Sequence, residues 1–173
     1  MAILFAVGVL AIVPKSRFRS SKSKKATGQV VCEGSFDLDA SADRALAFFT
    51  PEGERAWVKG WNPKAVYPPQ ADVAFQANAV FWVDQAGERS LWTIIEADLH
   101  EHTAEYVYVV QGERVSRVRV EIEPVGSRRC RVRVRYVHTA TSEKGLSFVA
   151  GVTDEAFAQK MRDWQRMVSG AIL

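Results

Sequence analysis

The stretch RVSRVRVEIEPVGSRRCRVRVRYVHTA, residues 114–140, alternates apolar and charged residues on either side of a short turn. Successive side chains of a β-strand point to opposite faces of its sheet, so the alternation predicts two strands that each have one apolar and one charged face. The short turn near Gly126 joins them as an antiparallel hairpin. We therefore expect a sheet with a buried inner face and a solvated outer face.

The charged face of this hairpin is rich in arginine, which raises a nucleic-acid surface as an alternative interpretation. The predicted turn, however, places Glu123 opposite Arg131 and Glu121 opposite Arg133. Opposite charges directly across a strand pair stabilise a solvent face modestly. We therefore interpret the arginines as a solvated face and expect no nucleic-acid partner.

Strand signals continue on both sides of the hairpin. VVCEGSFDLDA (30–40) is typical of a first strand, and short connections, several with glycine, separate the later ones. Six further strands are expected at 67–76, 79–84, 90–98, 103–111, 114–124 and 129–141. Connections this short imply hairpins, so the sequence predicts a seven-stranded antiparallel sheet.

Two short helices are expected between the first and second strands. Ser41 offers an N-cap for the first helix, and apolar residues follow it with helical spacing. Thr50 and Pro51 start the second helix, with proline at its first position, and Gly60 ends it.

The last segment predicts one long helix. Thr153 can cap it, and Asp154 in the first turn favours the helix dipole. We place Lys160 off the apolar stripe of this helix, which consists of Phe157, Met161, Trp164, Val168 and Ile172. The complete order of elements predicts an α+β fold in which the long helix lies across one face of the sheet.

The composition fits one globular domain, which we expect to span residues 29–173. Hydrophobic residues make up 47% of the 173 residues and charged residues 25%, which is ordinary for a domain that buries a core. The formal net charge is +3, but six lysines and arginines precede residue 26 with no acidic residue among them. Since those six charges exceed the net charge, the remainder carries −3, which argues against a nucleic-acid function of the folded part.

Residues 1–28 are expected to lie outside the domain. MAILFAVGVLAIV (1–13) is apolar, but as a helix it would span about 20 Å, short of the roughly 30 Å hydrocarbon core of a bilayer. Three interpretations stay open: a shallow membrane anchor aided by the basic residues, an extension without structure, and a helix packed on the domain or on a partner. Because the basic residues follow the apolar ones, we expect a cytoplasmic protein, either free or peripheral to the inner face of the membrane.

The chemically reactive residues form no metal or cofactor motif, so we expect neither group. Cys32 and Cys130 have no ligand spacing, and we interpret them as buried thiols in a reducing compartment. The stretch EADLHEH (96–102) places acids and histidines two residues apart, but it crosses a predicted hairpin turn. We therefore expect a solvated turn there and no metal site.

Four segments together resemble the START-like, or SRPBCC, superfamily, which includes polyketide cyclases, aromatase/cyclases, steroidogenic lipid-transfer domains and the birch-pollen-allergen proteins. They are residues 36–63 with the pattern TPEGERAW, 83–98, 120–145 with Tyr-x-x-Thr-Ala, and 148–173. The resemblance covers about residues 29–173. It implies a helix-grip fold, in which a curved seven-stranded antiparallel sheet wraps around a long C-terminal helix.

The resemblance also implies an apolar cavity between sheet and helix for a lipid-like, sterol-like or polyketide-like molecule. The many large aromatic residues agree with such a cavity, although they also suit a packed core. In this interpretation the segment 50–63 closes the cavity, with Trp57 turned inward and Trp61 anchoring the return to the sheet. The expected ligand-binding residues are Trp57, Trp61, Tyr67, Phe81, Trp92, Tyr106, Tyr108, Phe148, Phe157, Met161 and Trp164.

Binding or transport of a hydrophobic small molecule is the leading functional hypothesis. The alternative is a cofactor-free cyclase, dehydratase or hydrolase, which would need a positioned acid or base. The candidates are His138 on the inward parity of the last strand, its neighbour Tyr136, and Glu96 if its side chain points inward. For His138, a structural hydrogen bond is the competing interpretation.

Overall fold

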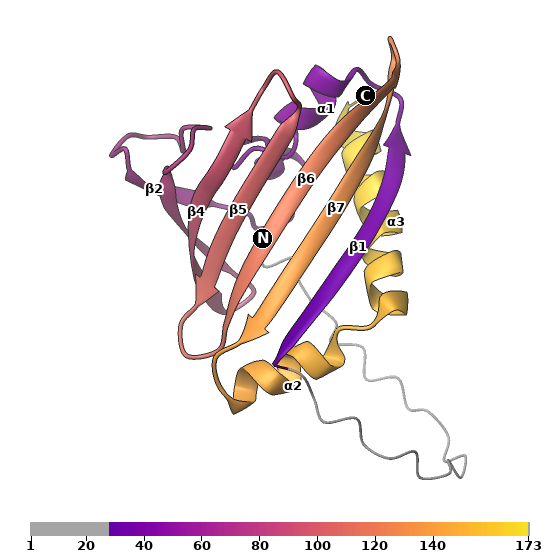
Figure 1. The fold of residues 1–173 in the computed structure, drawn as a ribbon. Coiled ribbons are helices and arrows are strands. Elements are labelled where there is room, and N and C mark those ends of the chain that lie inside the picture. Colours follow the sequence, from indigo (N-terminus) through magenta and orange to yellow (C-terminus); the bar gives the residue numbers. More distant parts are fainter. Residues whose placement is uncertain (1–27, 173) are drawn as a thin grey trace, which may run out of the picture.

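The computed structural model describes residues 28–172, which form one sheet and the helices that cover it (Figure 1). The predictions made for the apolar segment 1–13 and its basic neighbours lie outside these residues. Within the described part of the chain, no helix is both long enough and apolar enough to cross a bilayer.

The sheet is antiparallel and has seven strands in the order β1-β7-β6-β5-β4-β3-β2. Its strands are β1 (Gln29–Leu38), β2 (Pro63–Tyr67), β3 (Val80–Gln85), β4 (Glu88–Asp98), β5 (Thr103–Val110), β6 (Arg114–Gly126) and β7 (Arg129–Ala140). Every strand except β1 pairs with its neighbour in sequence, as short hairpin connections require. The first strand, β1, pairs with the last strand, β7, so these two distant segments of the chain lie side by side.

The register of the β6–β7 hairpin confirms the prediction from its alternating sequence. Glu123 lies opposite Arg131 and Glu121 opposite Arg133. Arg133 forms its ion pair diagonally with Glu123 at 2.7 Å, and Arg131 instead reaches Asp37 on β1 at 2.8 Å. The arginine side chains therefore form a solvated face cross-linked by carboxylates.

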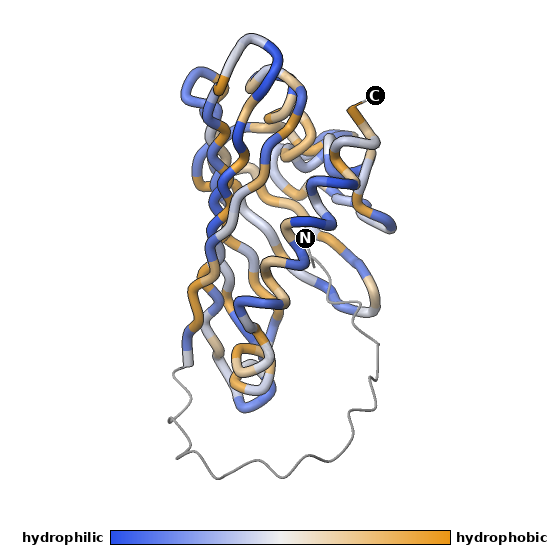
Figure 2. The backbone as a smooth tube through the Cα atoms, turned by 90° about the vertical axis from the view of Figure 1, so that its right-hand side faces the viewer, coloured by the Kyte–Doolittle hydropathy of each residue, from blue (hydrophilic) through white to orange (hydrophobic). Residues whose placement is uncertain are grey.

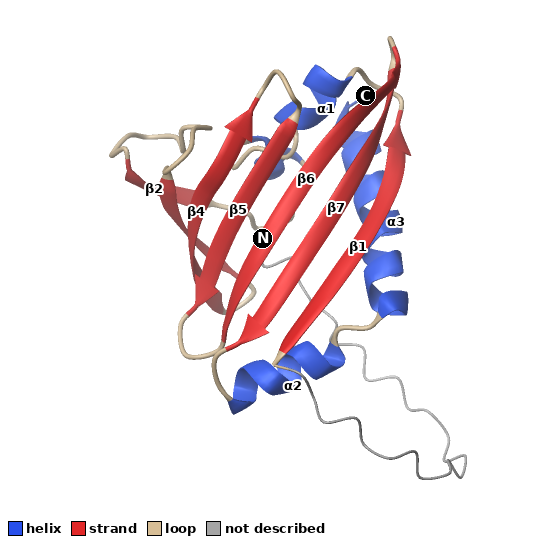
Figure 3. Cartoon of the chain, viewed as in Figure 1, coloured by secondary structure: helices blue, strands red, loops and turns tan. Residues whose placement is uncertain are grey.

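In residues 28–172, helical segments accompany the sheet (Figure 3). They are α1 (Ala42–Ala47), the short 3-10 helix η1 (Gly53–Ala56), α2 (Glu143–Gly151) and α3 (Asp154–Ile172). The predicted caps are present: Ser41 Oγ accepts a hydrogen bond from Arg44 N, and Thr153 Oγ1 accepts one from Ala156 N. In Figure 1, α1 and α2 lie at opposite ends of the long strands.

Three expectations about elements were wrong. The strand expected at 67–76 ends at Tyr67, because Pro68 and Pro69 lack the N–H groups that a ladder needs; the strand lies earlier, at Pro63–Tyr67. The second short helix begins at Gly53 and not at Pro51. Helix α2 was not predicted, although Ser142 caps it by accepting a hydrogen bond from Gly145 N.

Helix α3 packs along the inner face of the sheet against β1, so that sheet and helix form two layers (Figure 2). Its predicted apolar stripe is buried. The two layers lie in tight contact at Gly34 on β1, where an added Cβ atom would lie 2.6 Å from Met161 Cγ and 3.1 Å from Phe157 Cε1. A glycine is therefore needed there for the helix to reach the sheet.

Candidate ligand-binding interior

The two tryptophans of segment 50–63 are both buried. Trp57 donates its indole N–H to the carbonyl oxygen of Phe48 at 2.7 Å, and Trp61 donates to that of Pro51 at 2.7 Å. Buried indoles normally find such an acceptor. Their hydrogen bonds fix this turn-rich segment, which we call the cover, against the interior between sheet and α3.

Aromatic side chains from the sheet continue this cover into the interior. Trp61 meets Trp92 edge-on at 5.5 Å between ring centres, and Trp92 stacks on Tyr108 at 4.2 Å. On the helix side, Trp57 meets Trp164 edge-on at 5.2 Å. Most of the predicted ligand-binding residues are thus buried in one region: Trp57, Trp61, Phe81, Trp92, Tyr106, Tyr108, Phe157, Met161 and Trp164.

A small cavity lies in this region, with a volume of about 10 Å³. That volume holds about one water molecule. Larger ligands therefore enter only if the covering side chains or segment 50–63 move. The cavity is lined chiefly by Glu54, Trp61, Phe81, Trp92, Tyr106 and Trp164.

Glu54 brings a carboxyl group into this aromatic region, and sequence reasoning missed it. The residue is 7% exposed, and its Oε2 atom has no hydrogen-bond partner among the described residues. Burial raises the pKa of the carboxyl to about 8, since ionisation would place a charge among apolar groups. Glu54 is consequently mostly protonated at neutral pH and is able to donate a hydrogen bond as well as accept one.

Lys160 is the second ionisable group of the interior that sequence reasoning missed. Its Nζ atom lies 3.9 Å from the ring centre of Tyr136 and 5.2 Å from that of Trp164. Burial lowers the pKa of this amine to about 7, against the weaker opposing effect of Cys32 and Glu54. The prediction placed Lys160 off the stripe, but its positions three residues after Phe157 and four before Trp164 were the signal of an inward side chain.

Tyr136 and His138 lie on the inner face of β7, as their parity predicted. His138 is 3% exposed, and its Nδ1 lies 2.8 Å from the hydroxyl oxygen of Ser116. Burial, followed by the nearby charges of Lys160 and Arg114, lowers the pKa of His138 to about 3, so its imidazole is neutral at physiological pH. This environment fits a hydrogen-bonded structural histidine better than a base that works near neutrality.

The end of the interior near α2 contains a buried arginine. Arg114 donates to both carboxylate oxygens of Glu88 at 2.7 and 2.9 Å, and it also pairs with Glu113. Its guanidinium carbon lies 4.0 Å from the ring centre of Phe148 on α2. Phe148 in turn meets the His138 ring edge-on at 5.2 Å, so this predicted site residue lies at the α2 end and not at the cavity.

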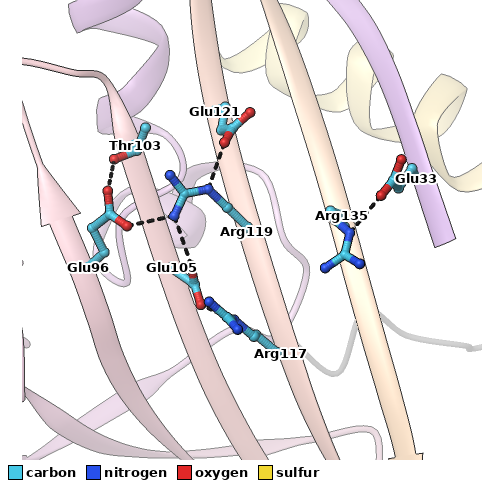
Figure 4. A network of polar contacts seen from close by, with 8 residues as sticks. All are labelled: Glu33, Glu96, Thr103, Glu105, Arg117, Arg119, Glu121 and Arg135. Atoms are coloured by element: carbon cyan, nitrogen blue, oxygen red, sulfur yellow. Dashed lines mark hydrogen bonds and ion pairs between the residues drawn. The ribbon is translucent and has the colours of Figure 1, made fainter. Parts of the chain in front are cut away.

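Two predicted site residues do not lie in the interior. Tyr67 is 59% exposed at the end of the edge strand β2, where the chain leaves the sheet. Glu96 points to the outer face, because a bulge between Ile94 and Glu96 shifts the alternation of β4 by one residue. Glu96 accepts hydrogen bonds from Thr103 at 2.6 Å and from Arg119 at 2.6 Å, as Figure 4 shows.

The outer network around Glu96 is structural in character. Arg119 also binds Glu105 and Glu121, and Arg117 binds Glu105 (Figure 4). Burial opposes the ionisation of Glu105, but its bonds to the two arginines outweigh that effect and hold its pKa below the usual range. Each carboxylate here already has a cationic partner, which leaves little for a ligand to bind.

The thiols and the acidic turn give no metal site in the described residues. Cys32 and Cys130 are free and buried, and burial raises the pKa of both thiols. His100 and Glu101 are exposed in the turn after β4, as predicted for EADLHEH. Within residues 28–172, no three of the histidine, cysteine, aspartate and glutamate side chains come together as metal ligands.

No family model and no curated protein matches the chain, whereas many solved structures do. Norcoclaurine synthase from Thalictrum flavum matches with a TM-score of 0.59 and 11% identity, over 93% of this chain and 96% of that one. A hypothetical protein from Helicobacter pylori gives 0.63 and 10%, over 94% and 100%. The di-domain ARO/CYC BexL gives 0.55 and 18%, over 80% of this chain and 46% of that one.

The seven-stranded antiparallel sheet around a long C-terminal helix defines a helix-grip protein of the α+β class. These solved structures share the fold of this chain, and it is the helix-grip fold that the resemblance to the START-like superfamily implied. At these low identities the likeness concerns the fold, and the function has to be argued from the site.

Proposed function

We propose that the chain binds a hydrophobic small molecule with a polar group in the interior between the sheet and α3. The observation that carries the proposal is the Glu54 carboxyl, which lies in an aromatic cavity with one oxygen unpaired among the described residues. A buried polar atom without a partner is costly, so a ligand that supplies a hydrogen bond gains from this group. The fold likeness supports the proposal, because norcoclaurine synthase has been solved in complex with dopamine and hydroxybenzaldehyde, two aromatic small molecules.

Because the cavity holds about one water molecule, we infer that binding is coupled to movement of the cover formed by segment 50–63. A fluorescent fatty acid, a fluorescent sterol and benzyl alcohol span the ligand sizes that such a movement would admit. Titration of the chain with each probe, together with native mass spectrometry, measures binding. If none of the three binds and no co-purified molecule is found, the proposal is wrong.

A Glu54→Leu variant separates binding from folding. Leucine removes the unpaired polar group, so the fold is expected to be at least as stable, while affinity for benzyl alcohol falls about tenfold with the loss of one hydrogen bond. Glu33→Gln, on the outer face, is the matched control and leaves affinity unchanged. If the Glu54→Leu variant binds benzyl alcohol with unaltered affinity, the Glu54 carboxyl does not contact the ligand.

A cofactor-free acid–base enzyme is the second candidate, and one observation favours it. Glu54 and Lys160 lie in the same interior with pKa values of about 8 and about 7, so each is able to gain or lose a proton near neutrality. These two groups replace Glu96 as candidates, since Glu96 lies on the outer face. Turnover whose pH profile follows both groups, and which Glu54→Gln abolishes while binding persists, would establish this function.

Residues 1–28 lie almost entirely outside the described part of the chain, and we propose for them the peripheral association with an anionic membrane face that the sequence suggests. Co-sedimentation with phosphatidylserine-containing vesicles and with neutral phosphatidylcholine vesicles tests it. Replacement of Lys22, Lys24 and Lys25 by glutamine removes three of the six basic residues and is expected to weaken any preference for the anionic vesicles. Equal partitioning of both proteins would reject the association.

A further inference from the structure

Lys160 points its amine toward the interior, whereas an ordinary surface lysine points its amine into solvent. Lysines at the side of a helix normally extend along the surface and keep the ammonium group in water. Here the residue is half-buried overall, but its Nζ atom faces three buried rings, at 3.9 Å from the ring centre of Tyr136, 5.2 Å from Trp164 and 5.6 Å from Phe157. The side chain thus places a primary amine against the wall of the interior.

Within residues 28–172, Lys160 forms no ion pair, and Glu54 acts on it only through a weaker electrostatic effect than that of burial. Lys144, by contrast, is exposed and pairs with Glu113 at 2.7 Å. The titratable groups that act on Lys160 are Cys32 on β1 and Glu54 on η1. Both are protonated, neutral groups at pH 7, since burial raises the pKa of each.

An amine in these surroundings is a nucleophile as well as a cation. With its pKa lowered to about 7 by burial, a large fraction of the Lys160 side chains carries a free lone pair at neutral pH. For an ordinary exposed lysine the neutral fraction at pH 7 is on the order of one in a thousand. A desolvated lysine in an apolar pocket is one of the recognised forms of an activated amine.

We propose that Lys160 forms an imine with the aldehyde or ketone group of an apolar ligand bound between the sheet and α3. This inference rests on the proposed function, because the carbonyl compound must first enter the interior. The rings of Tyr136, Phe157 and Trp164 would hold the apolar part of the ligand beside the amine, and they exclude the water that hydrolyses imines.

The reaction is balanced without an oxidant or a reductant. The lone pair of Nζ attacks the carbonyl carbon and forms a C–N bond, while the C=O π electrons move to the oxygen, which takes up a proton. The nitrogen then loses its protons, the hydroxyl leaves with a further proton as water, and a C=N double bond results. Glu54, protonated at neutral pH and in contact with the same cavity as Trp164, is suited to supply the proton for the departing water.

Reductive trapping tests the proposal on the full chain. Benzaldehyde is added at pH 7 with sodium cyanoborohydride, which reduces an imine to a stable secondary amine. Intact mass and peptide mapping then locate the benzyl group. We expect Lys160 to be modified at least about tenfold faster than the exposed Lys144, because far more of it is unprotonated at this pH. At pH 10 the ratio of the Lys160 rate to the Lys144 rate should be smaller, because more of the exposed Lys144 is then unprotonated.

Variants at the two lysines complete the experiment. Lys160→Met keeps the length and apolar stem of the side chain, so it is expected to fold and to lose the fast adduct, whereas Lys144→Arg keeps it. If Lys160 is modified no faster than Lys144, or if the fast adduct persists in Lys160→Met, the proposal is wrong.

Benzyl alcohol separates this inference from the proposed function, because it has the shape of benzaldehyde but no carbonyl. If both compounds bind and neither gives an adduct at Lys160, imine formation is rejected while ligand binding stands. If neither binds and no adduct forms, both proposals are rejected. Binding of both with an adduct at Lys160 alone supports both.

Discussion

Two buried glutamates show how the surroundings of a residue decide its chemistry. Glu105 is 1% exposed on the outer face but accepts hydrogen bonds from two arginines, which hold its pKa below the usual range. Glu54 is nearly as buried, has an oxygen without a partner among the described residues, and has a pKa raised to about 8. The first residue is a fixed anion of the scaffold, and the second is a protonated group able to respond to a ligand.

The site residues could be predicted only in part, for reasons visible in particular side chains. Strand parity placed Tyr136 and His138 correctly on the inner face, because alternation is a local property. Strand parity failed at Glu96, because a bulge between Ile94 and Glu96 turns its side chain to the outer face. No residue type in this stretch signals the bulge. Lys160 on α3 was placed outward because of its charge, although its spacing from Phe157 and Trp164 indicated an inward side chain.

We predict that Ser116→Ala destabilises the fold although it removes a single oxygen. Ser116 is fully buried, and its hydroxyl is 2.8 Å from His138 Nδ1, so alanine leaves a buried imidazole nitrogen unpaired. The expected loss is about 1–3 kcal/mol in the free energy of unfolding, measured with urea. Ser147→Ala, at an exposed position on α2, is the control and should change little. Equal stability of the two variants would contradict the role of this hydrogen bond.

At the scale of elements, the hairpins were more predictable than the helices and the edge strand. The β6–β7 register followed from alternation and one turn, and it was right to the residue. Strand β2 was shifted because an apolar run was extended across Pro68 and Pro69, which cannot continue a ladder. Helix α2 has nine residues and was missed because it follows a strand almost directly and presents no long apolar stripe.

The contact between β1 and α3 depends on the absence of a side chain at Gly34. We predict that Gly34→Ala destabilises the fold by about 1–3 kcal/mol, because its Cβ would lie 2.6 Å from Met161 Cγ and push the helix away. Urea unfolding measures the change. Shortening the partner in Gly34→Ala/Met161→Ala should give less than the sum of the two single losses. Gly126→Ala, where an added Cβ meets nothing within 4 Å, is the matched control.

The cover formed by segment 50–63 can be loosened without emptying the core. Trp57→Phe keeps an aromatic ring against Trp164 and removes the indole N–H that binds Phe48 O. We expect faster association and dissociation of a fluorescent fatty acid, with a stability loss of about 1–2 kcal/mol. Stopped-flow fluorescence measures the rates. If the rates match the wild type while stability falls, Trp57 is packing and not part of a moving cover.

For the whole molecule, the two faces of the sheet carry different kinds of side chain. The outer face pairs nearly every carboxylate with an arginine, as around Arg119, and these ion pairs hold the side chains in place. The inner face packs its aromatic rings against Glu54 of η1 and Lys160 of α3, two ionisable groups without ion pairs among the described residues. No single motif in the sequence encodes this division of charge between the two sides of the sheet.

The interior groups should therefore dominate how the stability of the whole fold depends on pH. Between the ordinary carboxyl value of 4.5 and about 8, the unfolded chain has lost the Glu54 proton that the folded chain keeps, so stability falls as pH rises, by at most about 1.4 kcal/mol per unit. Between about 7 and 10.5 the unfolded chain keeps a proton on Lys160 that the folded chain lacks, so stability rises with pH. His138, whose pKa is lowered to about 3, adds a rise up to about pH 6.5 that offsets much of the Glu54 fall below that pH. The three contributions together give a minimum near pH 7 to 8.

Urea unfolding at pH 5, 7.5 and 10 resolves the contributions of Glu54 and Lys160 when the wild type is compared with one variant for each group. Glu54→Gln should remove the falling limb between pH 5 and 7.5, because glutamine carries no titrating proton. Lys160→Met should remove the rising limb between pH 7.5 and 10 and leave the other. Since all other groups are shared, the differences between curves isolate the two side chains. Curves for both variants parallel to the wild type would mean that neither group is buried in the folded protein.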